Sequence, residues 1–172
     1  MNEHFAVCII VTNMAGVLTR ISSLFSQRGF NIDTFTSGAT ENPAYARITI
    51  TATGDQRKKD QLLKQLSKLY DVKKVEVMQP ENTILRELMI VKIKTDGDKL
   101  REVIDASSVF GGKVVDMNPG TVCVEMCGKG TKLDAFLNYV KAYGILEYCR
   151  TGLIAVERGS NCMFSQPVED AE

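Results

Sequence analysis

The chain has 172 residues, of which 44% are hydrophobic and 24% are charged. This apolar content is ordinary for a folded globular protein and excludes a wholly disordered chain. The 21 Lys and Arg residues balance the 21 Asp and Glu residues, so the composition lacks the basic excess that DNA-binding proteins carry. We therefore expect no nucleic-acid partner.

The N-terminal residues and the cysteines bear on the cellular compartment. No basic segment precedes the apolar run Phe5–Val11, and no apolar run approaches the ~18 residues of a transmembrane helix. The five cysteines are odd in number and widely spaced, which favours reduced thiols over a disulfide framework: Cys8, Cys123, Cys127, Cys149 and Cys162. We expect a cytoplasmic protein with no membrane partner.

The first half of the chain predicts four strands and two helices in the order βαββαβ. The strands are expected at residues 5–12, 31–37, 47–53 and 71–78. The helices are expected at residues 16–27 and 56–70, where apolar residues recur with a 3.6-residue period. A helix joins parallel strands and a short turn joins antiparallel ones, so this order predicts a four-stranded sheet with two helices on one face, the ferredoxin-like sandwich.

The second half repeats this order more loosely. Strands are expected at residues 86–94, 113–118, 121–127, 145–148 and 153–156, and helices at residues 98–110 and 131–142. The polar segment Gln79–Thr83 contains a proline and is interpreted as a linker. The fold class is therefore α+β, with two ferredoxin-like sandwiches in tandem at residues 1–79 and 84–159. Residues 160–172 have no periodicity and are expected to form a mobile tail.

Two features predict that copies of the chain associate. Each half has only about 75 residues, and a unit of that size buries a modest core. The first strand is also apolar on both faces, with Val7 and Ile9 on one and Cys8 and Ile10 on the other. A sheet with two apolar faces needs a second covering layer, so we expect an obligate oligomer.

The sequence offers no pattern of catalytic or metal-ligating residues. The single histidine, His4, lies near the chain start, where a histidine is more commonly a solvated side chain than a catalytic base. Cys123 and Cys127 would lie ~13 Å apart on a strand, too far to share a zinc ion. In Gly128–Thr131 a glycine separates the lysine from the threonine, unlike in a phosphate-binding loop. We expect no catalytic residue, metal site or cofactor in this chain.

The first strand-to-helix turn, residues 12–18, is the strongest candidate site. The unpaired N–H groups of a helix N-terminus bind carboxylates, and Gly16 lets a ligand approach the backbone closely. Asn13 can cap the helix or donate its side-chain amide to a ligand. A good turn would require the same residues, so on their own they leave both interpretations open.

Asn31 begins the second expected strand, at the far end of the first helix. Within one chain it should lie roughly 20 Å from Gly16, so the two could meet at one ligand only across a subunit boundary. The alternative is that Asn31 is a turn residue after Gly29.

One motif is specific: Asn13-x-x-Gly16-Val17-Leu18-x-Arg20-x-x-x-Leu24-Phe25-Ser26-x-Arg28-Gly29-Phe30-Asn31-Ile32. It closely resembles the ACT-domain opening of the small, regulatory subunits of acetohydroxyacid synthase (acetolactate synthase). Weaker matches extend as far as Arg150-Thr151-Gly152, so that the resemblance spans roughly residues 4–159.

The resemblance implies a non-catalytic subunit of branched-chain amino-acid biosynthesis. Its ACT domain would form a homodimer or a higher homo-oligomer and bind valine, or a related branched-chain amino acid, at the dimer interface. A separate catalytic subunit would hold thiamine diphosphate, Mg and FAD. This chain would activate that subunit and confer feedback inhibition. The site would comprise Asn13, Met14, Ala15, Gly16, Val17, Leu18, Asn31 and Ile32.

Two other classes of function stay open. ACT-like folds also occur in stand-alone ligand sensors linked to transcription, which would co-purify with a regulator or DNA. An independent small enzyme would need a nucleophile and a base, and the sequence does not pair them.

Overall fold

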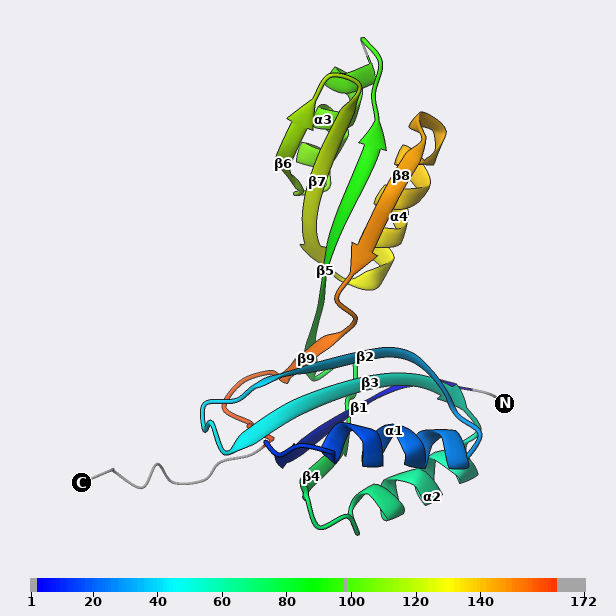
Figure 1. Ribbon diagram of the computed structural model, residues 1–172, viewed down its shortest axis with the longest axis vertical. Helices are drawn as coiled ribbons and strands as arrows, with labels where there is room; N and C mark the ends of the chain where they lie inside the picture. The colour runs from blue at the N-terminus through cyan, green and yellow to red at the C-terminus, as the bar shows by residue number, and fades with distance from the viewer. Residues whose placement is uncertain (1–2, 98, 164–172) are drawn as a thin grey trace, which may run out of the picture. The chain divides into compact units, whose positions relative to one another are not determined.

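The computed structural model describes residues 3–97 and 99–163. The chain divides into two compact units, one formed by residues 3–84 together with 153–163 and the other by residues 85–152. Each unit contains an antiparallel sheet and two α-helices (Figure 1), which confirms the α+β fold class. Among the described residues, no helix is long and apolar enough to cross a membrane.

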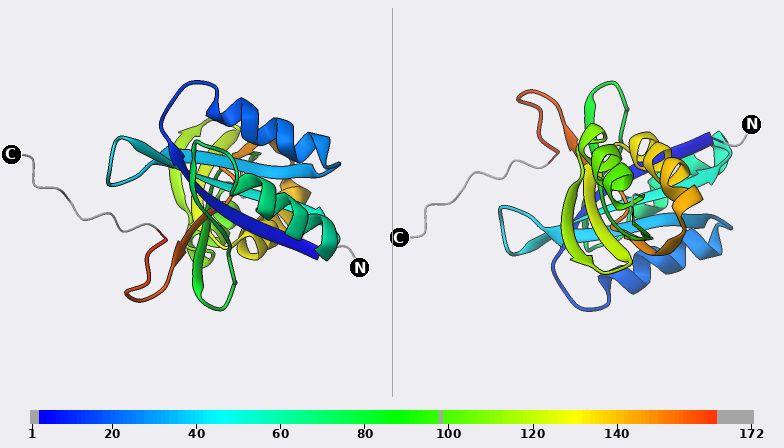
Figure 2. Two further views of the ribbon diagram at one scale, coloured as in Figure 1. Left: turned by 90° about the horizontal axis from the view of Figure 1, so that it is seen from below. Right: turned by 90° about the horizontal axis from the view of Figure 1, so that it is seen from above.

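The first unit has the predicted βαββαβ order. Its elements are β1 (Glu3–Thr12), α1 (Val17–Gln27), β2 (Asn31–Ala39), β3 (Tyr45–Gly54), α2 (Gln56–Leu66) and β4 (Val72–Val77). The strand order is β2-β3-β1-β4, and every neighbouring pair is antiparallel. The blue α1 and the green α2 lie on the same face of this sheet (Figure 2).

The apolar periodicity places both helices on the core. Val17, Ile21 and Phe25 of α1 are buried against Val7 and Ile9 of β1. Asp55 starts α2 by accepting the Lys58 N–H at 2.8 Å.

Helix α2 ends at Leu66, four residues before the predicted end at Tyr70. The N–H groups of Lys68 and Leu69 donate to carbonyls only three residues back, which tightens the chain into a turn. Tyr70 is 88% exposed, so its apolar ring extends the sequence pattern without contributing to the core.

The chain's own C-terminal segment, residues 153–163, belongs to the first unit. It contains β9 (Ile154–Glu157), whose Ala155 is fully buried and whose Ala155 carbonyl accepts the Cys8 thiol at 3.8 Å. The Arg158 N–H donates to the Asn82 carbonyl at 2.8 Å, and Met163 is buried. Cys8 lies on the sheet face opposite the core residues Val7 and Ile9, so this segment contacts the second face of β1.

This arrangement differs from the sequence-based expectation in two respects. Residues 153–159 were expected in the second domain, but they lie with the first. Cys8 and Ile10 are buried within a single chain, so the apolar second face of β1 does not by itself require another copy. The expected mobile tail includes the buried Met163, and its residues 164–172 lie outside the described residues.

The second unit repeats the order of the first. It contains β5 (Thr83–Lys94), α3 (Lys99–Val109), β6 (Lys113–Asn118), β7 (Thr121–Gly128), α4 (Gly130–Val140), the 3-10 turn η1 (Lys141–Tyr143) and β8 (Ile145–Arg150). The strand order is β6-β7-β5-β8, so β5 takes the place that β1 has in the first sheet. The predicted internal repeat is therefore present. Strand β5 begins within the segment that was expected to be a linker, and its first two residues lie in the first unit.

Candidate functional site

The loop between β1 and α1 is held against the loop between β2 and β3. The Asn13 N–H donates to the Ala44 carbonyl at 2.8 Å, and Asn13 Nδ2 donates to the Pro43 carbonyl at 3.2 Å. Gly16 precedes the helix with φ of +85°, a conformation that glycine adopts without strain. A Cβ at Gly16 would have no heavy atom within 4 Å, so the space beside this residue is open.

The N-terminus of α1 has donors without a capping side chain. Gly16 has no side chain to cap the helix, and no acidic residue lies in the first turn. The Arg20 N–H makes the first bond of the helix, to the Gly16 carbonyl at 3.1 Å. The N–H groups of Val17, Leu18 and Thr19 precede that bond and carry the positive end of the helix dipole. This geometry suits an anion such as a carboxylate.

The predicted site residues differ in what they can present to a ligand. The side chains of Met14 and Leu18, two residues before and after Gly16 in the sequence, are 67% and 45% exposed. Val17 is buried in the core with Ile21, so it can offer a ligand its backbone N–H but not its side chain. Ile32 is half-buried and packs against the same core.

Asn31 lies at the other end of α1, as expected. It begins β2, and its Nδ2 donates to Asp33 Oδ1 at 3.3 Å on the surface. Helix α1 has 11 residues and is therefore about 16 Å long. A single chain does not bring Asn13 and Asn31 together.

An ion pair that supports the loop was not predicted from the sequence. Arg20 Nη2 lies 2.6 Å from Asp71 Oδ2, and the Thr12 hydroxyl donates to Asp71 Oδ1 at 3.2 Å. The Thr12 N–H also donates to the Asp71 carbonyl at 2.8 Å. These contacts join the end of β1, the second turn of α1 and the start of β4. The separation of 51 positions between Arg20 and Asp71 gives no local signal of this pair.

The residues considered for catalysis are far from forming a reactive cluster. His4 is exposed, with Nδ1 3.4 Å from Thr53 Oγ1 and 3.4 Å from Asp33 Oδ2. In the described parts of the chain, no three His, Cys, Asp or Glu side chains gather as a possible metal site. Cys8 and Cys123 are buried, the other three cysteines are exposed, and all five are free thiols.

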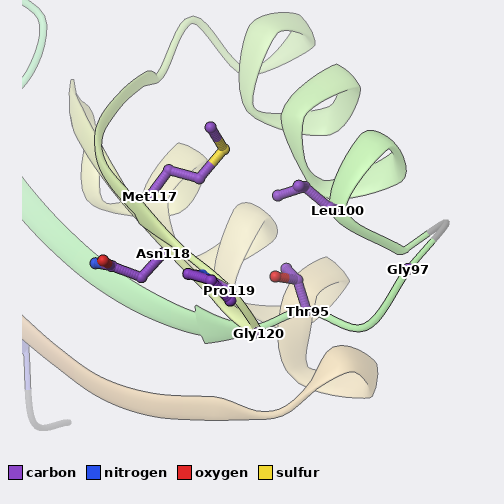
Figure 3. A pocket seen from close by; sticks show the side chains of 7 residues that line it. All are labelled: Thr95, Gly97, Leu100, Met117, Asn118, Pro119 and Gly120. Atoms are coloured by element: carbon purple, nitrogen blue, oxygen red, sulfur yellow. The ribbon is translucent and has the colours of Figure 1, made fainter.

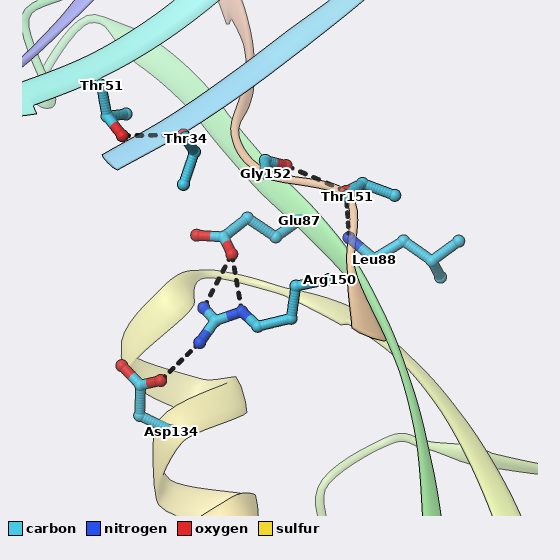
Figure 4. Close-up of polar contacts among 8 residues, drawn as sticks. All are labelled: Thr34, Thr51, Glu87, Leu88, Asp134, Arg150, Thr151 and Gly152. Atoms are coloured by element: carbon cyan, nitrogen blue, oxygen red, sulfur yellow. Dashed lines mark hydrogen bonds and ion pairs between the residues drawn. The ribbon is translucent and has the colours of Figure 1, made fainter. Parts of the chain in front are cut away.

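The second unit contains a polar cluster around Arg150 (Figure 4). Arg150 Nε and Nη2 donate to Glu87 Oε2 at 2.8 and 2.7 Å, and Nη1 donates to Asp134 at 2.6 Å. Burial lowers the pKa of Arg150, but the hydrogen bond to Asp134 and the charge of Glu87 outweigh it, so the pKa is raised overall. The Leu88 and Thr151 backbones are also joined, at 3.0 Å. The cluster fastens β5, β8 and α4 to one another.

Comparison with known proteins identifies the family. The family models described as "Small subunit of acetolactate synthase" and "AHAS small subunit-like ACT domain" match residues 86–159 and 7–74. The chain is 43% identical over 158 residues to the probable acetolactate synthase small subunit of Methanothermobacter thermautotrophicus, covering 91% of this chain and 94% of the relative. It is 36% identical over 156 residues to the acetolactate synthase isozyme 3 small subunit of Escherichia coli, covering 90% and 96%.

A solved structure agrees with the sequence comparison. The crystal structure of the acetolactate synthase small subunit from Thermotoga maritima matches with a TM-score of 0.85 at 34% identity, covering 92% of this chain and 99% of that one. The chain therefore belongs to the family of acetolactate synthase small subunits, and an ACT domain lies in its first unit.

Proposed function

We propose that this chain is the regulatory subunit of an acetolactate synthase. It binds a separate catalytic subunit, raises the activity of that subunit and makes it sensitive to inhibition by valine or a related branched-chain amino acid. Thiamine diphosphate, Mg and FAD belong to the catalytic subunit. The observation that carries the proposal is the uncapped N-terminus of α1 beside Gly16, in a chain of this family.

The amino acid binds at the loop between β1 and α1. Its carboxylate accepts hydrogen bonds from the N–H groups at the start of α1, where the helix dipole favours negative charge. Asn13 turns its side chain toward the ligand at the cost of one exposed bond to Pro43. The aliphatic part of the ligand packs against the exposed side chains of Met14 and Leu18.

A second copy supplies Asn31. Strand β2 lies at the edge of the sheet and runs from the C-terminal end of α1 back toward its N-terminal end. Edge strands pair readily with another chain. If two β2 strands pair antiparallel, the start of one lies beside the end of the other. Asn31 of one copy then approaches Gly16 of its neighbour, and a homodimer completes the site.

Regulation follows from differential binding. A ligand held by two chains favours the dimer arrangement in which both contribute their contacts. It inhibits only if that arrangement differs between the active and the inactive complex with the catalytic subunit.

A mixing assay tests the proposal. The catalytic subunit is assayed for acetolactate formation alone, with this chain, and with this chain plus valine, leucine or isoleucine. We expect stimulation by this chain and its reversal by at least one of the amino acids. Asn13→Ala should preserve the stimulation and weaken the reversal, because the side chain of Asn13 makes only an exposed contact within the fold. Absence of stimulation would contradict the regulatory role, and amino-acid inhibition unchanged by Asn13→Ala would contradict the site.

A further inference from the structure

Arg47 of β3 has a buried side-chain nitrogen without a hydrogen-bond partner. The residue lies on the sheet face opposite the helices, where Ile10 of β1 and Gly38 of β2 are its neighbours in register. Its Nε donates to Cys8 Sγ at 3.4 Å, whereas Nη2 is buried and makes no hydrogen bond to any described residue. None of the carboxylates in the described residues forms an ion pair with Arg47 either. A buried guanidinium nitrogen without an acceptor is unfavourable, so this place in the fold calls for an acceptor.

The open pocket in the second unit differs in this respect. It has a volume of about 340 Å³ and lies beside the β5–α3 loop, with Thr95, Leu100 and Met117 among its lining residues (Figure 3). None of the residues that line it has a buried side-chain nitrogen or oxygen without a hydrogen bond. The pocket therefore has no polar group that calls for a ligand, whereas the face at Arg47 has one.

A carboxylate is the acceptor that suits Arg47 best. The Nε and Nη2 hydrogens lie on one edge of a guanidinium and together hold a carboxylate, as Arg150 Nε and Nη2 hold Glu87 in the second unit. The face is open beside Gly38, where a Cβ would have no heavy atom within 4 Å. Arg47 is half-buried overall, so its guanidinium can turn toward that opening.

The segment 164–172 can supply this carboxylate. It contains no Lys or Arg and three acidic residues: Glu169, Asp170 and Glu172. It follows Met163, which is 3% exposed in the first unit, and the preceding β9 already contacts the same face of the sheet. Six residues from Met163 to Glu169 span up to about 20 Å, which exceeds the roughly 14 Å between the outer strands of a four-stranded sheet. The segment is therefore long enough to cross the sheet to Arg47.

We propose that residues 164–172 dock on this face and that the adjacent carboxylates of Glu169 and Asp170 provide the acceptor for Arg47 Nε and Nη2. The contact neutralises the cation and pairs its buried donor, and it holds β9 against the second face of β1. Attachment within the same chain gives the segment a high effective concentration at this face, which favours it over a carboxylate of a separate protein. The inference differs from the mobile tail that the sequence suggested, and it does not depend on the proposed function.

Backbone ¹⁵N relaxation of the full chain tests whether the segment is held. We expect order parameters of about 0.8 for Glu169 and Asp170 in the unchanged chain. They should fall below about 0.6 in Arg47→Met and in the double variant Glu169→Gln/Asp170→Asn. The double variant keeps the shape of both side chains and alters no described residue, so it remains decisive if Arg47→Met does not fold. The matched control Glu41→Gln/Glu81→Gln removes two exposed carboxylates of the first unit and should leave the order parameters unchanged.

The Arg47 Nε–H signal gives a second readout. It should shift in the double variant and stay in place in the control. Order parameters below about 0.6 in the unchanged chain would overturn the proposal. Retained order in Arg47→Met or in the double variant would overturn it as well, because the segment would then dock elsewhere or through other groups. A loss of order in the control would show that net charge, and not Arg47, holds the segment. An Arg47 signal that shifts only when the catalytic subunit is added would assign the acceptor to that subunit and overturn the proposal too.

Discussion

Arg20 Nη2 and Asp71 Oδ2 lie 2.6 Å apart, which joins the second turn of α1 to the residue that precedes β4. The Asp71 side chain is nearly buried, at 11% exposure, while that of Arg20 is 54% exposed. The same carboxylate accepts the Thr12 hydroxyl at the end of β1. Both chain segments that flank the loop of Asn13 and Gly16 are thereby attached to one carboxylate, which fixes the direction in which the first N–H groups of α1 point.

Replacing Arg20 by Gln should weaken this attachment. Asp71 would keep its bond to Thr12 but lose its charged partner, and we expect the free energy of unfolding to fall by about 1–2 kcal/mol. Urea unfolding monitored by circular dichroism measures the loss. Arg28→Gln, at the C-terminal cap of the same helix, removes only an exposed bond to Gln65 Oε1 and should cost less. An equal loss in the two variants would show that Asp71 does not depend on Arg20.

Gly16→Asp should abolish inhibition by valine, because it places a carboxylate beside the carboxylate of the ligand. Any side chain at φ of +85° adds strain, so Gly16→Asn is the matched control. Asn and Asp have the same shape and both tolerate the left-handed conformation, and each should lower stability by about 1 kcal/mol. Acetolactate formation in the reconstituted enzyme is measured against valine concentration for both variants. The comparison separates the effect of the added charge from the effect of backbone strain. Loss of inhibition in both variants to the same degree would attribute the effect to the backbone.

Asn31→Ala should reduce the affinity for valine without changing stability. Within one chain the Asn31 side chain donates an exposed hydrogen bond to Asp33 at 3.3 Å, so the loss of this bond costs little. At the dimer interface the same side chain would contact the ligand, and its loss should weaken binding about tenfold. Calorimetric titration with valine gives the affinity, and sedimentation velocity shows whether the dimer persists. Wild-type affinity in an intact dimer would remove Asn31 from the site.

Features of the fold that depend on neighbouring residues could be predicted from the sequence. The stripe of Val17, Ile21 and Phe25 places α1 on the core, and Gly29 ends the helix with φ of +70°. The loop before α1 could be predicted as a candidate site because the spacing of Asn13 and Gly16 is typical of the start of a helix. The loop between β5 and α3 lacks this signal, because it begins with Thr95 and not with an asparagine. The pocket beside this loop forms only in the folded unit, where the β6–β7 turn brings Met117 and Pro119 close to it.

Contacts between distant segments could not be predicted in the same way. Nothing near Cys8 indicates that Ala155 will lie against it, 147 positions later. The sequence correctly marked Cys8 and Ile10 as apolar residues that need cover, but it could not distinguish a second copy from the chain's own C-terminal segment.

The Arg150 cluster should stabilise the second unit unequally through its two carboxylates. The Glu87 side chain is 12% exposed and is held by two guanidinium nitrogens, while that of Asp134 is 59% exposed. Arg150→Ala leaves Glu87 nearly buried without a cation, and we expect a loss of about 2–3 kcal/mol. Asp134→Ala removes an exposed partner and should cost below about 1 kcal/mol. Hydrogen–deuterium exchange of peptides from β5 and β8 measures both losses.

The raised pKa of Arg150 also predicts how this cluster responds to pH. A cation whose pKa is higher in the folded state contributes its full stabilisation below the pKa of the unfolded chain and loses it only as the pH rises through the folded value. Because arginine is already fully protonated at neutral pH in an unfolded chain, exchange rates corrected for intrinsic chemistry should stay constant between about pH 6 and 9. Arg150→Lys should retain only part of the protection, since lysine cannot reproduce the pair of bonds that Arg150 Nε and Nη2 make to Glu87 Oε2.

The cover over the second face of β1 can be tested through the reactivity of Cys8. Ala155 is fully buried, whereas its neighbour Val156 is 47% exposed. Ala155→Asp would bury an unpaired carboxylate beside Cys8, which costs more than the contacts of β9 can offset, so the segment should detach. We expect alkylation of Cys8 by iodoacetamide, followed by peptide mass spectrometry, to become at least about tenfold faster in this variant. Val156→Asp places the same charge on the outer side of the strand and should leave the rate unchanged, as should the rates at the exposed Cys127 and Cys149 in both variants. A Cys8 rate that is equally slow in Ala155→Asp would show that other residues are sufficient to cover this face of the sheet.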